Sequence, residues 1–196
     1  MRRTSSQAAP VEDRERRAER ERELLTRAAG GDAAAVRDIF RTHVERLHRH
    51  VARLLGPGDP DVEDVVQQTF LAALDGAYGF DGRSSLSTWL FGIATRRALD
   101  AARGRWRRHR WSRAVEAVGL GAQHVAPDRA YEANTDAQAI LDKLQPDQRL
   151  VFVMHDVEGY TFAEISGITD TGISTLHGRL MAARKKIESL VGGANG

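Results

Sequence analysis

Residues Thr161 to Leu190 decide the fold of this chain, and they read TFAEISGITDTGISTLHGRLMAARKKIESL. Thr161 and Glu164 have the spacing of a capping box, in which the two side chains satisfy free backbone N–H groups at the start of a helix. The stretch therefore begins with a short helix, which we expect to end near Ser166.

A turn and a second, longer helix follow. Gly167 and Asp170 tolerate turn or left-handed backbone geometry, and Thr171 is a suitable cap for the next helix. Apolar residues then recur at steps of three and four, which places them on one face of a helix. They are Ile173, Leu176, Leu180, Ala183, Ile187 and Leu190. Two helices joined by a tight turn are the pattern of a helix-turn-helix.

The face opposite this apolar stripe combines small polar residues with cations. Small side chains let a helix lie deep in the major groove of DNA, and cations at its edges contact phosphates. The face therefore predicts DNA recognition, although an amphipathic surface helix in a bundle has the same periodicity. Its residues are Ser174, Thr175, Gly178, Ala182 and Lys185, with His177, Arg179, Arg184 and Lys186 at its edges.

The composition restricts the possible functions. The 196 residues suffice for one domain or two small ones, and a net charge of +2 with a pI near 9.3 suits a local basic patch that binds nucleic acid. The absence of cysteine excludes disulfides, thiolate catalysis and cysteine zinc sites. His48 and His50 leave a helix in different directions, so we expect no metal site. No catalytic motif occurs, and we expect neither enzymatic activity nor a cofactor.

The N-terminal region and the apolar runs predict the location of the protein. No apolar run reaches the length of a membrane span, and Arg2 and Arg3 precede no apolar segment of an export signal. We therefore expect a cytoplasmic protein without membrane insertion. Residues 1–23 are densely charged and offer no apolar face, so we expect a disordered arm or a frayed helix there.

A first group of helices is predicted upstream of the helix-turn-helix. One helical apolar pattern ends at Gly56–Gly58, and Asp59 with Pro60 starts the next helix. The polar face of that helix is acidic and rich in amides, and it carries Asp64, Gln67 and Gln68. This face is either solvated or a docking surface for a basic partner.

A loop rich in glycine and serine at residues 78–85 leads into a third helix. Ser84 or Ser85 is suited to cap this helix. Trp89 lies in phase with its apolar face, so we expect the ring to be at least partly buried.

An arginine run, Arg105–Arg113, follows this helix and contains Trp106 and Trp111. Arginines bind phosphates, and tryptophan rings stack on unpaired bases. The sequence is equally compatible with both rings being packed in the core.

The remaining sequence predicts a linker and a second group of helices. Residues 115–134 lose helical periodicity and contain glycine and proline. Five consecutive apolar residues, Leu150–Met154, predict a buried helix because Pro146 precedes them and other helices surround them. We expect the charged residues at its end, Asp156 and Glu158 among them, to be solvated.

These patterns predict an all-α fold of two small helical domains joined by a flexible linker. The expected divisions are a disordered charged arm at 1–23, a first domain at 24–113, a linker at 114–134 and a second domain at 135–192.

The two domains together resemble an RNA polymerase sigma factor of the extracytoplasmic-function (ECF) group of the sigma-70 family. Asp61–Leu74 (DVEDVVQQTFLAAL) is similar to the polymerase-docking helix of region 2, and Ser84–Asp100 (SSLSTWLFGIATRRALD) to its minus-ten helix. In the second half, Leu144–Ile165 (LQPDQRLVFVMHDVEGYTFAEI) and Ile173–Ile187 (ISTLHGRLMAARKKI) resemble region 4.

The resemblance implies roles for the matching positions. The residues that would dock on the clamp helices of the polymerase large subunit are Asp64, Gln67 and Gln68. The residues that would bind the minus-ten element are Gly82, Arg83, Ser84, Ser85, Thr88, Trp89, Arg96, Arg97 and Asp100, of which the first four would form a loop that captures a flipped base. The residues that would bind the minus-thirty-five element are Ser174, Thr175, His177, Gly178, Arg179 and Lys185.

The resemblance further implies a transcription initiation factor. Such a protein binds core RNA polymerase through its clamp helices and flap region, recognises both promoter elements, assists promoter melting and is commonly controlled by an anti-sigma protein. One alternative is a stand-alone helix-turn-helix regulator whose first half senses a ligand or dimerises. Another is a single-stranded RNA-binding module built on Arg105–Arg113.

Overall fold

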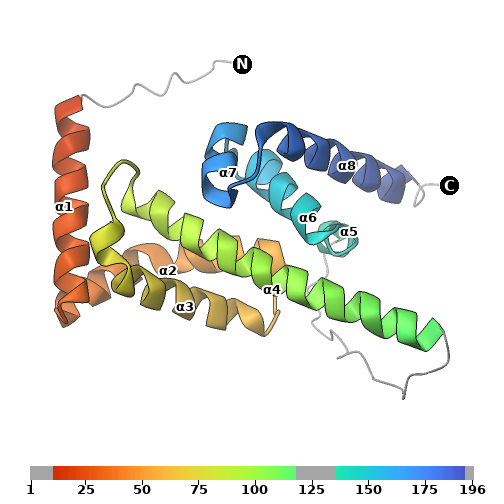
Figure 1. The fold of residues 1–196 in the computed structure, drawn as a ribbon, viewed down its shortest axis with the longest axis horizontal. Coiled ribbons are helices and arrows are strands. Elements are labelled where there is room, and N and C mark those ends of the chain that lie inside the picture. Colours follow the sequence, from red (N-terminus) through yellow and green to blue (C-terminus); the bar gives the residue numbers. More distant parts are fainter. Residues whose placement is uncertain (1–10, 118–135, 193–196) are drawn as a thin grey trace.

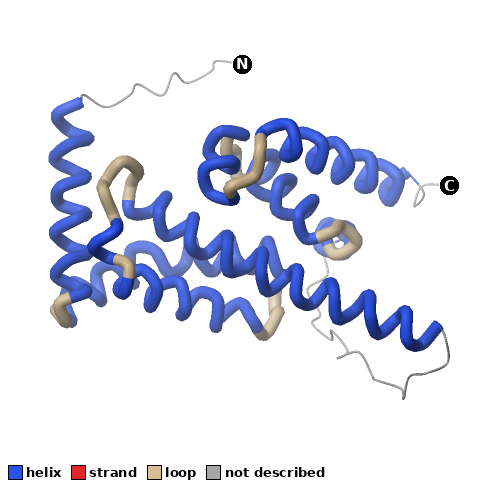
Figure 2. The backbone as a smooth tube through the Cα atoms, in the orientation of Figure 1, coloured by secondary structure: helices blue, strands red, loops and turns tan. Residues whose placement is uncertain are grey.

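The computed structural model describes residues 11–117 and 136–192. Helices and the loops between them account for these residues, and no strand occurs in either range (Figure 2), which confirms the predicted all-α class. The elements are α1 (Val11–Ala29), α2 (Ala33–Leu55), α3 (Asp61–Asp75), the 3-10 turn η1 (Ala77–Gly79), α4 (Leu86–Ala117), α5 (Asp136–Leu141), α6 (Pro146–Phe152), the π-helical turn η2 (Val153–Val157), α7 (Phe162–Thr169) and α8 (Ile173–Gly192).

The first lobe consists of α1 to α4, and the second lobe of α5 to α8 (Figure 1). In the first lobe, α4 packs against α2 and α3, which also pack against each other. The side chains of Leu47, Val51 and Leu90 are fully buried between these helices. The helical periodicity of the apolar residues thus produces a three-helix core, with α1 packed against its outer side.

The predicted capping box forms at the start of α7. The Glu164 backbone N–H donates to Thr161 Oγ1 (3.3 Å), and the Thr161 backbone N–H donates to Glu164 Oε2 (2.8 Å). The helix continues to Thr169, so the predicted end near Ser166 is wrong. Asp170 ends it in the left-handed conformation, with a φ of 52°, which a short polar side chain tolerates.

The second helix of the motif, α8, begins at Ile173. The Thr171 hydroxyl donates to the Thr169 carbonyl (3.3 Å) instead of accepting from the first turn of α8, so the predicted capping role is wrong. Leu176 and Leu180 are buried as the apolar stripe predicts, whereas Ile173 at its start is 48% exposed.

Of the two alternatives predicted for residues 1–23, the disordered arm is wrong over residues 11–23, because these residues are helical and form most of α1. Ion pairs between residues one turn apart support this helix, among them Glu12–Arg16 and Arg17–Glu21. Such exposed pairs stabilise a helix by only about 0.2–0.5 kcal/mol each. Near its C-terminal end, Leu25 and Ala28 are buried against the first lobe. Residues 1–10 lie outside the described part of the chain.

Helix α4 is longer than predicted, because it continues through the arginine run to Ala117. The first residues of the predicted linker, 114–117, are therefore helical. Trp106 is half-buried, but Trp111 is 74% exposed. The alternative in which the ring packs in the core is therefore wrong for Trp111. The rest of the predicted linker, 118–134, lies outside the described residues.

The predicted buried helix at Leu150–Met154 is confirmed. It spans the end of α6 and the start of η2, and Leu150, Val151, Val153 and Met154 are buried.

The two lobes pack against each other through this region. Helices α6 and α7 lie on α4, and α6 also contacts α2. Figure 1 shows α4 as the long helix of the first lobe that lies between α2 and α3 on one side and the second lobe on the other. One continuous cluster of buried apolar side chains extends from Leu25 in the first lobe to Leu180 in the second.

Candidate nucleic-acid interface

The acidic and amide-rich face of α3 points away from the core. Val62, Val65 and other apolar residues of α3 are buried, which fixes the opposite side of the helix toward solvent. Asp64 and Gln67 are exposed there, and Gln68 is half-buried. These three side chains form no hydrogen bond or ion pair with any residue that the structure describes, so their polar groups are available to a partner.

The loop at 81–85 is held by α1, the helix that sequence reasoning treated as an arm. Arg22 Nη2 donates to the Asp81 carbonyl (2.8 Å). Glu21 Oε2 accepts from the Leu86 backbone N–H (2.8 Å), so a carboxylate from α1 occupies the N-terminus of α4. A negative charge is favourable at that position because of the helix dipole.

Gly82 is required by this packing. Its φ is +74°, and a Cβ placed there would lie 2.9 Å from Arg22 Nη2 and 3.0 Å from Ala18 Cβ. A side chain at this position would therefore be strained in its backbone and would also displace α1. The neighbouring Arg83 is exposed, and its guanidinium forms an ion pair with Asp81.

Ser85 caps α4, as one of the two predicted candidates. The Thr88 backbone N–H donates to Ser85 Oγ (3.1 Å), and the two hydroxyl groups lie 2.9 Å apart. Ser84 beside it is half-buried. Trp89 is half-buried as predicted, and its ring is tilted against that of Phe80 with the centroids 5.3 Å apart. The loop and the first turn of α4 thus form one continuous surface.

Two turns further along α4, one of the predicted DNA-binding arginines already has a protein partner. Arg96 Nη1 donates to the Ile168 carbonyl (2.9 Å), near the C-terminal end of α7. Arg97 is half-buried and has no hydrogen-bonding or ion-pair partner among the described residues, and Asp100 is exposed.

The polar face of α8 is mostly free in this structure. Ser174, Thr175, Gly178 and Lys185 are exposed, as the predicted recognition face requires. The other two predicted positions, His177 and Arg179, have partners within the protein.

His177 and Arg179 both contact the second lobe itself. The His177 ring stacks on Phe162, with the centroids 3.8 Å apart. Arg179 forms an ion pair with Asp147 (3.1 Å), and the other partner of this carboxylate is Arg103 of α4 (2.6 Å). Asp147 therefore joins a helix of the first lobe to the predicted recognition helix.

A buried polar contact between the lobes was not predicted from the sequence. Glu158, expected to be solvated, has a side chain that is only 9% exposed, and it accepts from His50 Nδ1 (2.8 Å) and Arg53 Nη1 (3.0 Å). His50 is fully buried, and its Nε2 lies 2.8 Å from Thr95 Oγ1. Together with the Arg96–Ile168 contact, these residues define what we call the seam. His50 and Glu158 are 108 positions apart, so no local pattern could have indicated their contact.

The seam is expected to loosen in acid. Burial raises the pKa of Glu158, but hydrogen bonds from His50 and Arg53 and their positive charges lower it more, so the pKa lies below its ordinary value of 4.5. A lowered carboxyl pKa stabilises the packed lobes fully above pH 4.5, and this contribution is lost as the pH falls through the lowered value. Energy transfer between labels on Asp75→Cys and Lys186→Cys should therefore decrease below pH 4.5.

This pH response can be separated from general acid unfolding. The chain has no cysteine of its own, so the two labels attach only where cysteines are introduced. Glu158→Gln removes the titrating group and should flatten the response. An equally steep response in that variant, with helical circular dichroism retained, would show that another group controls the seam.

Within the described residues, no group of side chains has the arrangement of a metal site. None of the helices in those same ranges is long and apolar enough to cross a membrane.

Comparisons with known sequences match the two lobes separately. The profile of Sigma-70 region 2 matches residues 39–108, and that of Sigma-70, region 4 matches residues 135–187. SigM of Mycobacterium tuberculosis, an ECF RNA polymerase sigma factor, is 30% identical over 175 residues, which cover 88% of this chain and 85% of SigM. The RNA polymerase sigma factor CarQ of Myxococcus xanthus is 31% identical over 176 residues, which cover 86% of this chain and 95% of CarQ.

Solved structures have a similar fold. CnrH, in complex with the cytosolic domain of CnrY, matches with a TM-score of 0.58 and 26% identity over 88% of this chain and 97% of that one. The sigma factor RpoE of Bartonella quintana, in complex with the anti-sigma factor NepR, matches with a TM-score of 0.56 over 79% of this chain and 95% of that one. Its sequence identity is 23%, so this likeness shows a shared fold.

Proposed function

This chain belongs to the ECF group of RNA polymerase sigma factors, and we propose that it uses three separate surfaces to bring core polymerase to its promoters and open them. A sigma factor directs RNA polymerase to promoters. The alternative of a stand-alone helix-turn-helix regulator is wrong, because the first lobe matches sigma region 2 and is not a separate sensing domain. We propose that the protein acts in the cytoplasm and that the polymerase supplies all of the chemistry.

The first proposed surface is the α3 face, which would dock on the clamp helices of the polymerase large subunit. Asp64 and Gln67 are exposed and unpaired within the described residues, and the helix that carries them is fixed by its buried apolar side. Acidic groups of this kind suit a basic partner surface and increase its association rate. The polymerase flap region is the proposed partner of the second lobe.

The second surface is the loop at 81–85 with the start of α4, which would bind the minus-ten strand. A flipped base would enter beside the loop, and Trp89 would stack on an unpaired base. Further along α4, Arg97 would contact phosphates together with Arg96. The third surface is the exposed face of α8, which would enter the major groove of the minus-thirty-five element.

The proposed divisions of the chain follow these surfaces. Residues 24–113 would act as sigma region 2, residues 114–134 as the linker and residues 135–192 as region 4. Helix α1 extends the first lobe to residue 11.

Full DNA binding would require the seam to open. Arg96, one of the proposed DNA contacts, is bound across the seam by the Ile168 carbonyl. The packed lobes therefore hold back part of the proposed minus-ten surface. An anti-sigma protein, such as the partner found with RpoE, is the proposed regulator.

Charge reversal on α3 tests the proposed function. Asp64→Arg should weaken binding to purified core polymerase at least tenfold, because it places a cation on an acidic docking face. The measurement is a fluorescence titration of labelled protein with core polymerase, followed by run-off transcription.

Asp38→Arg on α2 is the matched control, since Asp38 is also exposed and its carboxylate forms no ion pair in the described structure. It should leave polymerase affinity within about twofold of the original. Unchanged affinity of Asp64→Arg would overturn the proposed docking face, and a chain that never binds polymerase would overturn the proposed function itself.

A further inference from the structure

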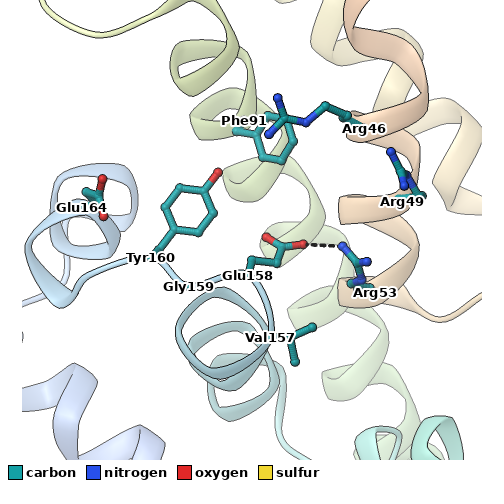
Figure 3. A pocket seen from close by; sticks show the side chains of 9 residues that line it. All are labelled: Arg46, Arg49, Arg53, Phe91, Val157, Glu158, Gly159, Tyr160 and Glu164. Carbon is teal, nitrogen blue, oxygen red and sulfur yellow. Dashed lines mark hydrogen bonds and ion pairs between the residues drawn. The ribbon is translucent and has the colours of Figure 1, made fainter. Parts of the chain in front are cut away.

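A cleft of about 480 Å³ lies along the seam and takes its walls from both lobes (Figure 3). This volume falls within the range of about 300–1,000 Å³ that is typical of small-ligand sites. The residues that line the cleft are Arg46, Arg49, Arg53, Phe91, Val157, Glu158, Gly159, Tyr160 and Glu164.

Three arginines of α2 line one wall. Arg46, Arg49 and Arg53 are spaced so that they share one face of the helix. Arg53 is paired with Glu158. The guanidinium carbon of Arg46 lies 5.5 Å from the centroid of the Phe91 ring, and this is a cation–π contact that leaves the N–H groups available.

The guanidinium of Arg49 has few contacts with the protein. Its Nε donates at 3.4 Å to the Glu45 backbone carbonyl, and its guanidinium forms no ion pair with any described residue. Two guanidinium groups in this wall thus keep most of their donors for a ligand.

The opposite wall contributes a hydroxyl donor. Tyr160 forms no side-chain hydrogen bond within the described residues, and Figure 3 shows its hydroxyl directed toward Phe91 and Arg46. Burial and the nearby Glu158 carboxylate raise the pKa of the phenol, although Arg46 opposes this. The phenol therefore carries its proton at neutral pH and can donate a hydrogen bond.

We propose that this cleft binds a small phosphate-bearing anion. Guanidinium groups bind phosphate through paired N–H donors, and here two of them line one open cleft together with a phenol. The cleft also contains the carboxylates of Glu158 and Glu164, which are bonded to His50 and Arg53 and to Thr161. A compact anion needs to contact only Arg46, Arg49 and Tyr160, whereas the backbone of a nucleic-acid strand would also have to pass these carboxylates.

Such a ligand would hold the lobes together. Arg46 and Arg49 belong to the first lobe and Tyr160 to the second, so the complete site exists only when the seam is closed. A ligand that binds one of two conformations shifts the population toward that conformation. The anion would therefore favour the arrangement in which Arg96 is bound by the Ile168 carbonyl of the second lobe.

Binding is tested with inorganic pyrophosphate as the probe. Calorimetric titration of the full chain at constant ionic strength should show saturable binding with one site. The double variant Arg46→Gln/Arg49→Gln should weaken it at least tenfold. The control Arg37→Gln/Arg41→Gln removes the same charge from exposed positions of α2 outside the cleft, and it should change affinity less than twofold.

Two further measurements separate this site from general charge attraction. Tyr160→Phe retains the ring and should weaken binding about threefold. Pyrophosphate should raise energy transfer between labels on Asp75→Cys and Lys186→Cys, and the cleft double variant should lose this response. Circular dichroism establishes that each variant is folded.

Several outcomes would overturn the proposal. These are an absence of saturable binding, an equal loss in the control double variant, or competition by a single-stranded oligonucleotide that binds the same arginines more tightly. None of these measurements uses polymerase or a promoter, so they can fail while the proposed function holds, and the reverse is also possible.

Discussion

Glu158→Ala is expected to open the two lobes. The carboxylate is nearly buried and holds a buried histidine and an arginine, and removal of one partner from a buried charged contact costs about 3–5 kcal/mol. At about 1.4 kcal/mol per tenfold, the closed population should fall relative to the open one by roughly 100-fold or more. Single-molecule energy transfer between labels on Asp75→Cys and Lys186→Cys measures the two populations.

The comparison variant is Glu45→Ala, which removes an exposed carboxylate from α2. It should leave the energy-transfer distribution unchanged. In transcription assays with limiting protein, Glu158→Ala should increase the yield of run-off product, because Arg96 becomes available to DNA. An unchanged distribution in a folded Glu158→Ala protein would mean that the seam does not depend on this carboxylate.

Trp89→Ala is expected to reduce open-complex formation while binding to core polymerase changes less than twofold. The lost stacking on an unpaired base corresponds to about 1–3 kcal/mol, or roughly 5- to 150-fold at about 1.4 kcal/mol per tenfold. Permanganate reactivity of unpaired thymines in the promoter measures the open complex, and a fluorescence titration measures polymerase binding.

The partial burial of Trp89 makes a second variant necessary. Its ring packs on Phe80, so alanine also removes packing from the first lobe, whereas Trp89→Phe retains much of that contact and an aromatic face. Trp89→Phe should recover most of the promoter opening. Tyr78→Ala removes an 85% exposed ring that has no proposed DNA role and should have little effect. Parallel losses of opening and polymerase binding in a folded Trp89→Ala protein would refute a specific role in opening.

The parts of the fold that depend on neighbouring residues were predictable from the sequence. The capping box of Thr161 and Glu164 spans three residues and forms as expected. The stop at Gly56 and the buried helix at Leu150–Met154 also follow from short patterns. In each case, the residues that determine the structure lie within one or two helical turns.

The contacts between distant residues were not predictable. Glu158 and Asp147 have the ordinary appearance of charged residues near helix ends, and only the packing of the lobes places them against His50, Arg53 and Arg103. The same holds for the start of α1: residues 11–23 offer no apolar face in the sequence, and the bonds of Glu21 and Arg22 to Leu86 and Asp81 join residues far apart in the chain. The proposed DNA-binding and polymerase-binding residues themselves remain predictions.

The grip of α1 on the loop at 81–85 has a consequence for promoter choice. Glu21 and Arg22 bond to the backbone of Leu86 and Asp81 at the two ends of that loop, and neither is among the proposed DNA contacts. Changes in this N-terminal helix could therefore retune which base the loop accepts while leaving every reading side chain intact. A search for variants with altered start-site preference should accordingly include residues 18–22, and a shortened protein that begins at residue 24 should select promoters less sharply.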